Sequence, residues 1–163
     1  MKRPILLFMT IFFLVTAAGA ALAQNAPIEI KSSALVEKTV VNEKGEKKLV
    51  RQPAAKVLPG EEVIFINTYV NKGQAPADDV VINNAIPEHM IYVGDSAQGD
   101  DTVVTYSVDD GQTFGPLLDL TFTEPDGTKR PAASVDVTHI RWTRTTPLPP
   151  NQTAQVDFRA RLK

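Results

Sequence analysis

Apolar and polar residues alternate along most of the chain after Gln24, and helical periodicity is nearly absent there. The last segment is the clearest case, because the even positions from Val156 to Leu162 are apolar and the odd positions are polar or charged. Strict alternation is typical of strands that bury one face and expose the other. Segments of this kind recur between turn residues, which predicts an all-β fold, an antiparallel β-sandwich of about nine strands.

Two alternating segments near the C-terminus predict the centre of the core. Ile140 and Trp142 share one face of the first segment, and Val156 and Phe158 share one face of the second. The Pro147–Asn151 stretch between them cannot continue a strand ladder and predicts a loop. Because consecutive strands often pair, we expect these two strands to be neighbours, with Trp142 buried close to Phe158.

Two segments upstream predict how the N-terminal part joins the core. Residues 28–41 and 47–57 flank Asn42–Gly45, a turn sequence that predicts a β-hairpin. We expect a hairpin extension over residues 24–57 and a core over residues 58–163, within a single domain, 24–163. The strand predicted at Glu62–Asn71 is apolar at both even and odd positions. It is therefore either a central strand covered on both faces, with the hairpin as the favoured cover, or a strand that meets a partner.

The first 23 residues have the organisation of a secretory signal peptide. Lys2 and Arg3 precede an apolar run from Ile5 to Val15, and Ala21-Leu22-Ala23 supplies the small residues of a cleavage site. The run is shorter than the roughly 20 residues of a transmembrane span, so a membrane anchor fits less well. We expect cleavage after Ala23 and a periplasmic or secreted product.

Composition narrows the classes of function. The chain has no cysteine, which excludes disulfides, thiolate metal sites and a cysteine nucleophile. A formal net charge of −2 argues against nucleic acid as a partner, because such proteins usually present a basic surface. No apolar stretch after the signal peptide is long enough to span a bilayer. The two histidines and the serines lie in no metal-ligand or nucleophile motif, so we expect no cofactor and no enzymatic activity.

Acidic residues are concentrated in one segment. Eleven acids and no Lys or Arg lie between Gln74 and Thr128. If successive loops fall at alternate ends of a sandwich, three acid-bearing loops share one end. Those loops carry Asp78, Asp79, Asp95, Asp100, Asp101 and Asp126. Clustered carboxylates attract hard cations, so the predictions are a weak calcium site or a solvated acidic end.

Basic residues are concentrated on the last two predicted strands. If Trp142 and Phe158 point inward, the opposite face presents four side chains, which are those of His139, Arg141, Arg159 and Arg161. Such a face could bind an anionic polysaccharide or the acidic part of another copy. The alternative is a solvated face whose arginines pair with Asp157 and neighbouring acids, and surface pairs of that kind stabilise a fold little.

The segment Ser107–Phe114 has the S-x-D-x-G-x-T-F pattern of an Asp-box hairpin, which is found in sialidases and other propellers. In such a turn the Asp109 carboxylate accepts backbone N–H groups, Gly111 adopts a left-handed conformation and the aromatic ring packs beneath. Propellers repeat the motif over about 4–8 blades, whereas this chain has one copy. The motif therefore predicts a stabilised turn, and enzyme ancestry is the weaker interpretation.

Five short stretches, in order, resemble a bacterial exported Ig-like domain of unknown function that occurs singly or in tandem in surface proteins. They are Pro59–Phe65, Asn71–Gly73, Ala77–Ile82, Ile86-Pro87 and Tyr92–Ser96. The resemblance implies an Ig-like sandwich and an exported setting, and it implies no reaction. Such domains usually carry an acid shortly before the Ile-Pro step, where this chain has Asn83-Asn84.

Together these patterns predict an exported, non-enzymatic structural or adhesion-type interaction module of the bacterial envelope. The expected partner is an envelope or surface protein or a second copy of the chain, with an anionic polysaccharide as another candidate. The alternative is a calcium- or carbohydrate-binding domain of the same fold. An enzyme fragment that uses the Asp-box is the third interpretation.

Overall fold

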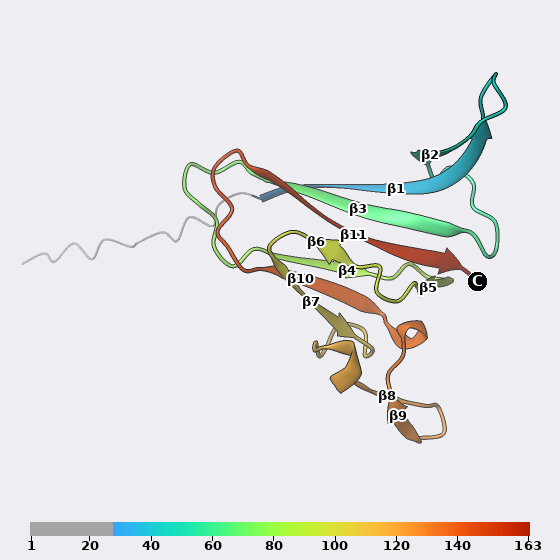
Figure 1. Cartoon of the computed structure of the whole chain (residues 1–163). Coiled ribbons are helices and arrows are strands. Elements are labelled where there is room, and N and C mark those ends of the chain that lie inside the picture. The colour runs from blue at the N-terminus through green and yellow to red at the C-terminus, as the bar shows by residue number, and fades with distance from the viewer. Residues whose placement is uncertain (1–27) are drawn as a thin grey trace, which may run out of the picture.

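The computed structural model describes residues 28–163, which fold into eleven β-strands and two short 3₁₀ helices (Figure 1). The predicted signal peptide, residues 1–23, and its cleavage site lie outside the described residues. Nine of the eleven strands form two antiparallel sheets, and the other two form a separate small hairpin.

The larger sheet has the strand order β2-β1-β3-β11-β5, and β6 pairs with a further part of β11. Its strands are β1 (Ile28–Val41), β2 (Lys47–Pro53), β3 (Glu62–Asn71), β5 (Met90–Tyr92), β6 (Gln98–Gly99) and β11 (Thr153–Leu162). The smaller sheet has the order β4-β10-β7. Its strands are β4 (Val81–Ala85), β7 (Thr102–Ser107) and β10 (His139–Arg144). The separate hairpin of β8 (Thr121–Thr123) and β9 (Lys129–Pro131) lies between the helices η1 (Leu117–Asp119) and η2 (Ser134–Asp136).

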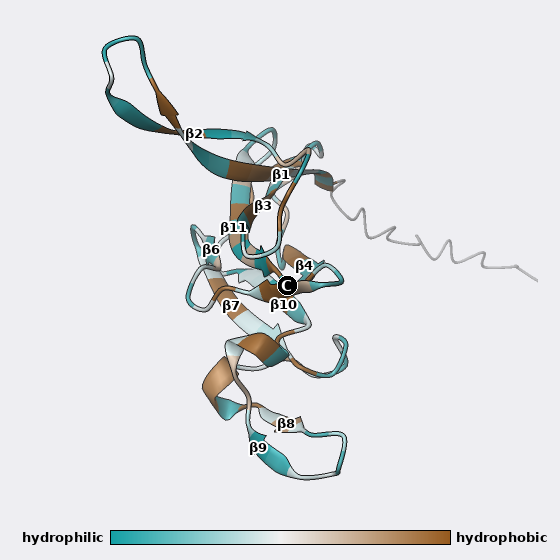
Figure 2. Cartoon of the chain, turned by 90° about the vertical axis from the view of Figure 1, so that its right-hand side faces the viewer, coloured by the Kyte–Doolittle hydropathy of each residue, from teal (hydrophilic) through white to brown (hydrophobic). Residues whose placement is uncertain are grey.

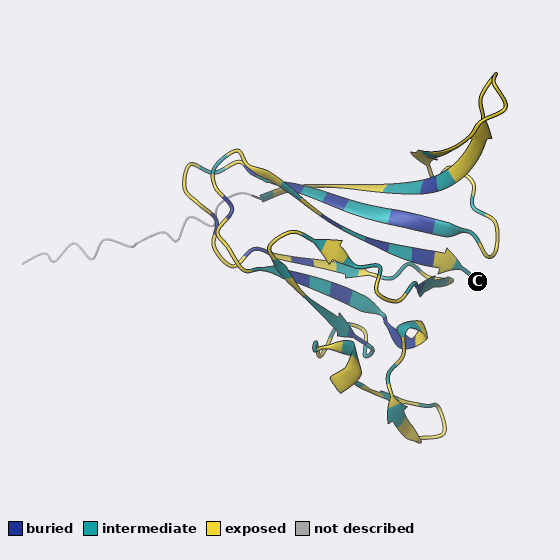
Figure 3. Cartoon of the chain, in the orientation of Figure 1, coloured by how far each residue is buried: buried dark blue, intermediate teal, exposed yellow. Residues whose placement is uncertain are grey.

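The two sheets pack face to face and enclose an aliphatic and aromatic core, so the predicted antiparallel sandwich is confirmed (Figure 3). Trp142 of β10 is 1% exposed and Phe158 of β11 is fully buried, with their ring centroids 6.1 Å apart. The predicted burial of Trp142 beside Phe158 is therefore confirmed. Phe65 of β3 stacks on Phe158 at 5.1 Å and continues this aromatic row.

The prediction that the last two strands are neighbours is wrong, because β10 and β11 belong to opposite sheets. The proline-rich loop between them crosses from one sheet to the other instead of closing a hairpin. Leu148 in this loop is fully buried, and its backbone exchanges two hydrogen bonds with Ala77. The buried Asn71 side chain also donates to the Leu148 carbonyl at 2.8 Å, which fixes the crossing.

The predicted N-terminal hairpin is present, with β1 and β2 joined through the turn at Asn42–Gly45. Its first strand extends the larger sheet at the edge of β3 and does not cover a face of it. The strand Glu62–Asn71 is central, between β1 and β11, but the prediction that the hairpin covers one of its faces is wrong. On the face of β3 that points away from the core, Ile64 is still 2% exposed, between its cross-strand neighbours Leu35 and Arg159.

Residues 36–53 of the hairpin extend past β3 and are called the arm below, because β1 pairs with β3 only as far as Leu35. Figure 2 shows the arm leaving the sandwich on one side and the β8–β9 hairpin leaving it on the other. Almost every residue of β2 is exposed to solvent. The arm therefore keeps its shape mainly through its own ladder and through contacts at its base.

Candidate functional site

Four of the predicted acidic site residues lie at one end of the sandwich. Asp78 and Asp79 belong to the loop from β3 to β4, and Asp100 and Asp101 form the turn from β6 to β7. The same end is reached by β10, because the Arg144 amide donates to the Val80 carbonyl and the Thr145 amide to the Asp101 carbonyl. The Arg144 guanidinium also lies 3.7 Å from the Asp101 carboxylate, so part of this acidic charge is compensated.

The other two predicted acids lie elsewhere, so the prediction of three acidic loops at one end is wrong. Asp126 lies in the turn of the β8–β9 hairpin, which is inserted at the opposite end of β7 and β10. Its carboxylate accepts the Thr128 amide at 2.8 Å, and this hydrogen bond lowers the pKa of Asp126. Asp95 follows β5, beside Ser96, whose hydroxyl accepts the Arg159 amide. Between residues 28 and 163, no three His, Cys, Asp or Glu side chains are placed to hold a metal ion.

The predicted basic face is also wrong, because its residues lie on opposite sheets. His139 and Arg141 belong to β10, whereas Arg159 and Arg161 belong to β11. Since both strands point their apolar side chains into the shared core, their polar faces point in opposite directions. The error follows from the assumption that consecutive strands pair. No single ligand surface can therefore contain all four side chains.

The two arginines of β11 hold the base of the arm. Arg159 donates to Glu37 of β1 at 2.9 Å, and Glu37 also accepts Arg51 of β2 at 3.0 Å. These hydrogen bonds, with that from Arg159 the larger cause, lower the pKa of Glu37. Arg161 donates to Glu62 at 2.6 Å on the same side of the sheet. The two arginines thus pair with acids, as the solvated alternative predicts, but their partners are Glu37 and Glu62 and not Asp157.

The Asp-box forms the stabilised turn that its sequence predicts. The Asp109 carboxylate accepts four hydrogen bonds, from the Ser107 and Thr113 hydroxyls and from the Gln112 and Thr113 amides. These bonds hold the pKa of Asp109 well below its usual range. Gly111 has a φ of +81°, the left-handed conformation that the motif requires.

The aromatic residue of the Asp-box has a partner that the sequence does not indicate. The guanidinium of Arg141 lies 3.5 Å from the centroid of the Phe114 ring, and its Nε donates to Asn83 at 2.9 Å. A cation over an aromatic face is attracted by the ring quadrupole. Arg141 therefore joins the Asp-box turn to the adjacent strands of the smaller sheet.

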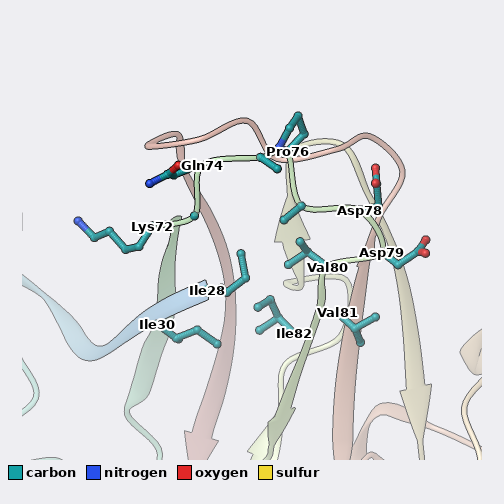
Figure 4. A pocket seen from close by; sticks show the side chains of 13 residues that line it. Ile28, Ile30, Lys72, Gln74, Pro76, Asp78, Asp79, Val80, Val81 and Ile82 are labelled. Atoms are coloured by element: carbon teal, nitrogen blue, oxygen red, sulfur yellow. The ribbon is translucent and has the colours of Figure 1, made fainter. Parts of the chain in front are cut away.

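The feature that sequence analysis misses is an open groove of about 960 Å³ along one flank of the sandwich (Figure 4). Ile28 and Ile30 of β1 line it from the larger sheet, and Val80 and Ile82 line it from the smaller sheet. The loop 72–79 closes one end. Figure 4 shows the isoleucines of the two sheets facing the same space. Ile30 is 50% exposed although it has the inward parity of its strand.

Both strands that border the groove present free backbone groups along it. In an antiparallel sheet, alternate residues direct N–H and C=O together toward opposite neighbours. The Ala34 carbonyl accepts the Ala54 amide, so the backbone N–H and C=O groups of even residues in β1 point toward the β2 side. No strand of the described chain pairs there with Ile28, Ile30 and Ser32.

The same reasoning applies to β4 on the other side of the groove. The Val80 carbonyl accepts the Arg144 amide, and the Ile86 amide donates to the Thr138 carbonyl. The backbone N–H and C=O groups of even residues in β4 therefore point toward β10. Its odd residues, Val81, Asn83 and Ala85, therefore point their backbone groups away from the sheet. The Ala85 carbonyl accepts the Asn84 side chain, whereas Val81 and Asn83 have no strand partner on that edge within residues 28–163. The groove is thus bordered by two strand edges.

The groove has an acidic rim at one end, and polar side chains link the two sheets beyond its other end. Asp78 and Asp79 are exposed on its rim, and Lys72 is the one cation among the residues that line it. Farther along, Ser32 donates to Asn67 at 2.6 Å and Asn67 donates to Asn84 at 2.9 Å, which links the sheets. A ligand that suits this site therefore combines aliphatic side chains, backbone donors and acceptors, and positive charge.

No helix among the described residues has the length and apolarity needed to cross a membrane. Comparison with protein-family models, with curated proteins and with solved structures finds no match to this chain. The resemblance to an exported Ig-like domain therefore stays a prediction. The candidate site rests on the geometry of the groove alone.

Proposed function

We propose that the chain is an exported, non-enzymatic structural or adhesion-type interaction module of the bacterial envelope, and that it binds a protein partner by strand addition along the groove. The observation that carries the proposal is the pair of strand edges that border the groove, with the aliphatic side chain of Ile30 half exposed between them. An extended segment that enters such a site gains main-chain hydrogen bonds, and its alternate side chains fill the apolar space.

The physical argument for a partner is the cost of leaving this flank open. A strand edge is a template for pairing, and folded proteins usually shorten, charge or cover their edges. Here Ile30 is 50% exposed toward the groove, and Val81 on the β4 edge is 45% exposed on the outer face of the smaller sheet. Covering them removes apolar surface from water, which favours a complex by roughly 25 cal/mol for each Å² before the entropic cost of association is subtracted.

As part of the same proposal, the sandwich is a variant of the Ig-like architecture. Two antiparallel sheets packed face to face support this assignment. In the immunoglobulin order the last two strands share a sheet, whereas here β11 lies opposite β10 and beside β3. The variation places β1 at the border of the groove, since β1 extends the sheet that β3 and β11 form.

Site-specific photo-crosslinking in the exporting cell tests the proposal. A photoreactive residue at Ile30 should give a discrete adduct with one protein. The matched control is Val103 on β7, which is also aliphatic, on a strand and 53% exposed, and it should give none. Absence of an adduct from position 30, or equal adducts from both positions, contradicts the proposal.

A further inference from the structure

We infer that the groove accepts the arm of a second copy of this chain, so that the protein assembles head to tail. The inference rests on the proposed strand-addition function and names its partner. Five of the nine exposed large hydrophobic residues in the described chain lie on the arm or the groove. They are Ile30 and Val81 of the groove, and Val40, Val41 and Leu49 of the arm.

The arm carries the chemistry that the groove lacks. Val41 is 62% exposed and Leu49 is 59% exposed, and the register of the hairpin puts both on one face as diagonal neighbours. Residues 36–53 contain five cationic and three acidic side chains, a net charge of +2. Two of the cations, Lys47 and Lys48, are exposed at the start of β2. These lysines complement Asp78 and Asp79 on the rim of the groove.

The outer edge of β2 in the arm also has free backbone groups that can pair with another strand. The Asn42 amide donates to the Glu46 carbonyl and the Ala54 amide to the Ala34 carbonyl. The backbone N–H and C=O groups of even residues in β2 therefore point toward β1. Its odd residues, Lys47, Leu49 and Arg51, therefore point their backbone groups outward. Leu49 thus offers both an exposed aliphatic side chain and unpaired backbone groups, matching Ile30 on the groove.

The arm cannot reach the groove of its own chain. Both features lie on β1, whose first residues line the groove and whose last residues form the arm. Thr39, which pairs with Leu49, is nine residues beyond Ile30, and a strand rises about 3.3 Å per residue. The separation is therefore roughly 30 Å along a hydrogen-bonded strand. The ion pairs of Glu37 with Arg51 and Arg159 hold the arm in that direction.

A contact between two different surfaces of identical chains is heterologous, so it propagates into chains or closes into rings. Each copy then donates its arm to one neighbour and accepts an arm from another. Leu49 and Val41 of the arm cover Ile30 and the aliphatic lining of the groove, and the lysines lie beside the two aspartates. Because this contact is partly electrostatic, added salt should weaken it.

Two variants, one for each surface, distinguish association through the arm and the groove from any other mode of association. The arm variant carries Lys47→Glu and Lys48→Glu. The groove variant carries Asp78→Lys and Asp79→Asn, because Asp79 has a φ of +52° that asparagine tolerates. All four positions are exposed, so folding should be preserved. Leu118→Ser is the control, since Leu118 is apolar, 93% exposed and remote from both surfaces.

Analytical ultracentrifugation of the purified full chain should show concentration-dependent association, weakened about tenfold or more in each variant and unchanged in Leu118→Ser. An equimolar mixture of the arm and groove variants should regain association, because the intact groove of the first accepts the intact arm of the second, and the altered arm and altered groove again carry opposite charges. A monomeric wild type at millimolar concentration, or a mixture that stays monomeric, overturns the inference. If the chain is monomeric but position 30 crosslinks to a different protein, the self-assembly fails and the proposed function stands.

Discussion

The two flanks of the sandwich differ in how the space between the sheets is closed. On the flank beside β7, the strands β5 and β6 pair with β11, and the Tyr92 hydroxyl lies 3.3 Å from that of Tyr106. The same Tyr92 hydroxyl accepts the Ala97 amide at 3.1 Å. On the flank beside β4, the Asn67–Asn84 hydrogen bond links the sheets, and the groove lies beyond it.

The difference shows which surface is built for stability and which is available for binding. Gly99 on the closed flank packs so tightly that an added Cβ would lie 2.7 Å from Val156. Ile30 on the open flank has the same inward orientation and remains 50% exposed. The space between the sheets is thus filled beside Gly99, whereas beside Ile30 it leaves room for another strand.

The largest expected effect comes from the core that both flanks share. Trp142→Ala should lower the free energy of unfolding by about 3–5 kcal/mol, because it removes a large aromatic ring from a packed interior. Ile30→Ala on the open flank should cost less than about 1.5 kcal/mol, since half of that side chain is already exposed. Urea denaturation of the two variants measures both values. Equal losses would contradict the distinction between core and groove.

A smaller effect is expected on the closed flank. Gly99→Ala should destabilise the fold by about 1–3 kcal/mol, because the new methyl group overpacks a tight contact with Val156 and Trp142. The comparison variant is Ser32→Ala on the open flank, which removes one partly buried hydrogen bond and should cost about 0.5–1.5 kcal/mol. Thermal unfolding of both variants shows which substitution lowers the stability more. If Gly99→Ala is neutral, the closed flank is looser than its geometry indicates.

The smallest expected effect depends on pH and concerns the base of the arm. Hydrogen bonds from Arg159 and Arg51 lower the pKa of Glu37 in the folded chain. The stabilisation is therefore fully present above the pKa of the unfolded chain and is lost as pH falls through the lower folded pKa. Glu37→Gln should lower the melting temperature at neutral pH, and the difference from wild type should disappear in strong acid.

The control for this experiment is Glu43→Gln, in the exposed turn of the arm. That substitution should leave the melting temperature almost unchanged at every pH, because single surface charges contribute little. A difference for Glu37→Gln that persists unchanged into strong acid would show that the carboxylate does not act through its charge.

The strands and the centre of the core follow from the sequence because alternation is a local property. Val156 to Leu162 reveals its buried face without any knowledge of its neighbours, and so does the segment with Trp142. Pairing between strands is not local. The Pro147–Asn151 loop is compatible with a hairpin or a crossing, and the choice decides whether Arg141 and Arg159 share a face.

The groove was beyond sequence analysis for a related reason. Ile28 and Ile30 look like ordinary core residues of an alternating strand. Their exposure depends on where β2 stops pairing with β1 and on which strand lies opposite. The acidic positions Asp78 and Asp79 were identified, but the argument for a calcium site placed Asp126 beside them, and the inserted β8–β9 hairpin lies at the other end.

Hydrogen exchange of the backbone amides in β1 is the most direct test of the open flank. In dilute solution the amides of Ile30 and Ser32 should exchange nearly as fast as in an unfolded chain, whereas those of Lys31 and Ser33, which point toward β3, should be protected. Raising the protein concentration should protect Ile30 and Ser32 as an arm adds to the edge. If these two amides are as protected as their neighbours in the dilute monomer, the flank is closed and the central claim is wrong.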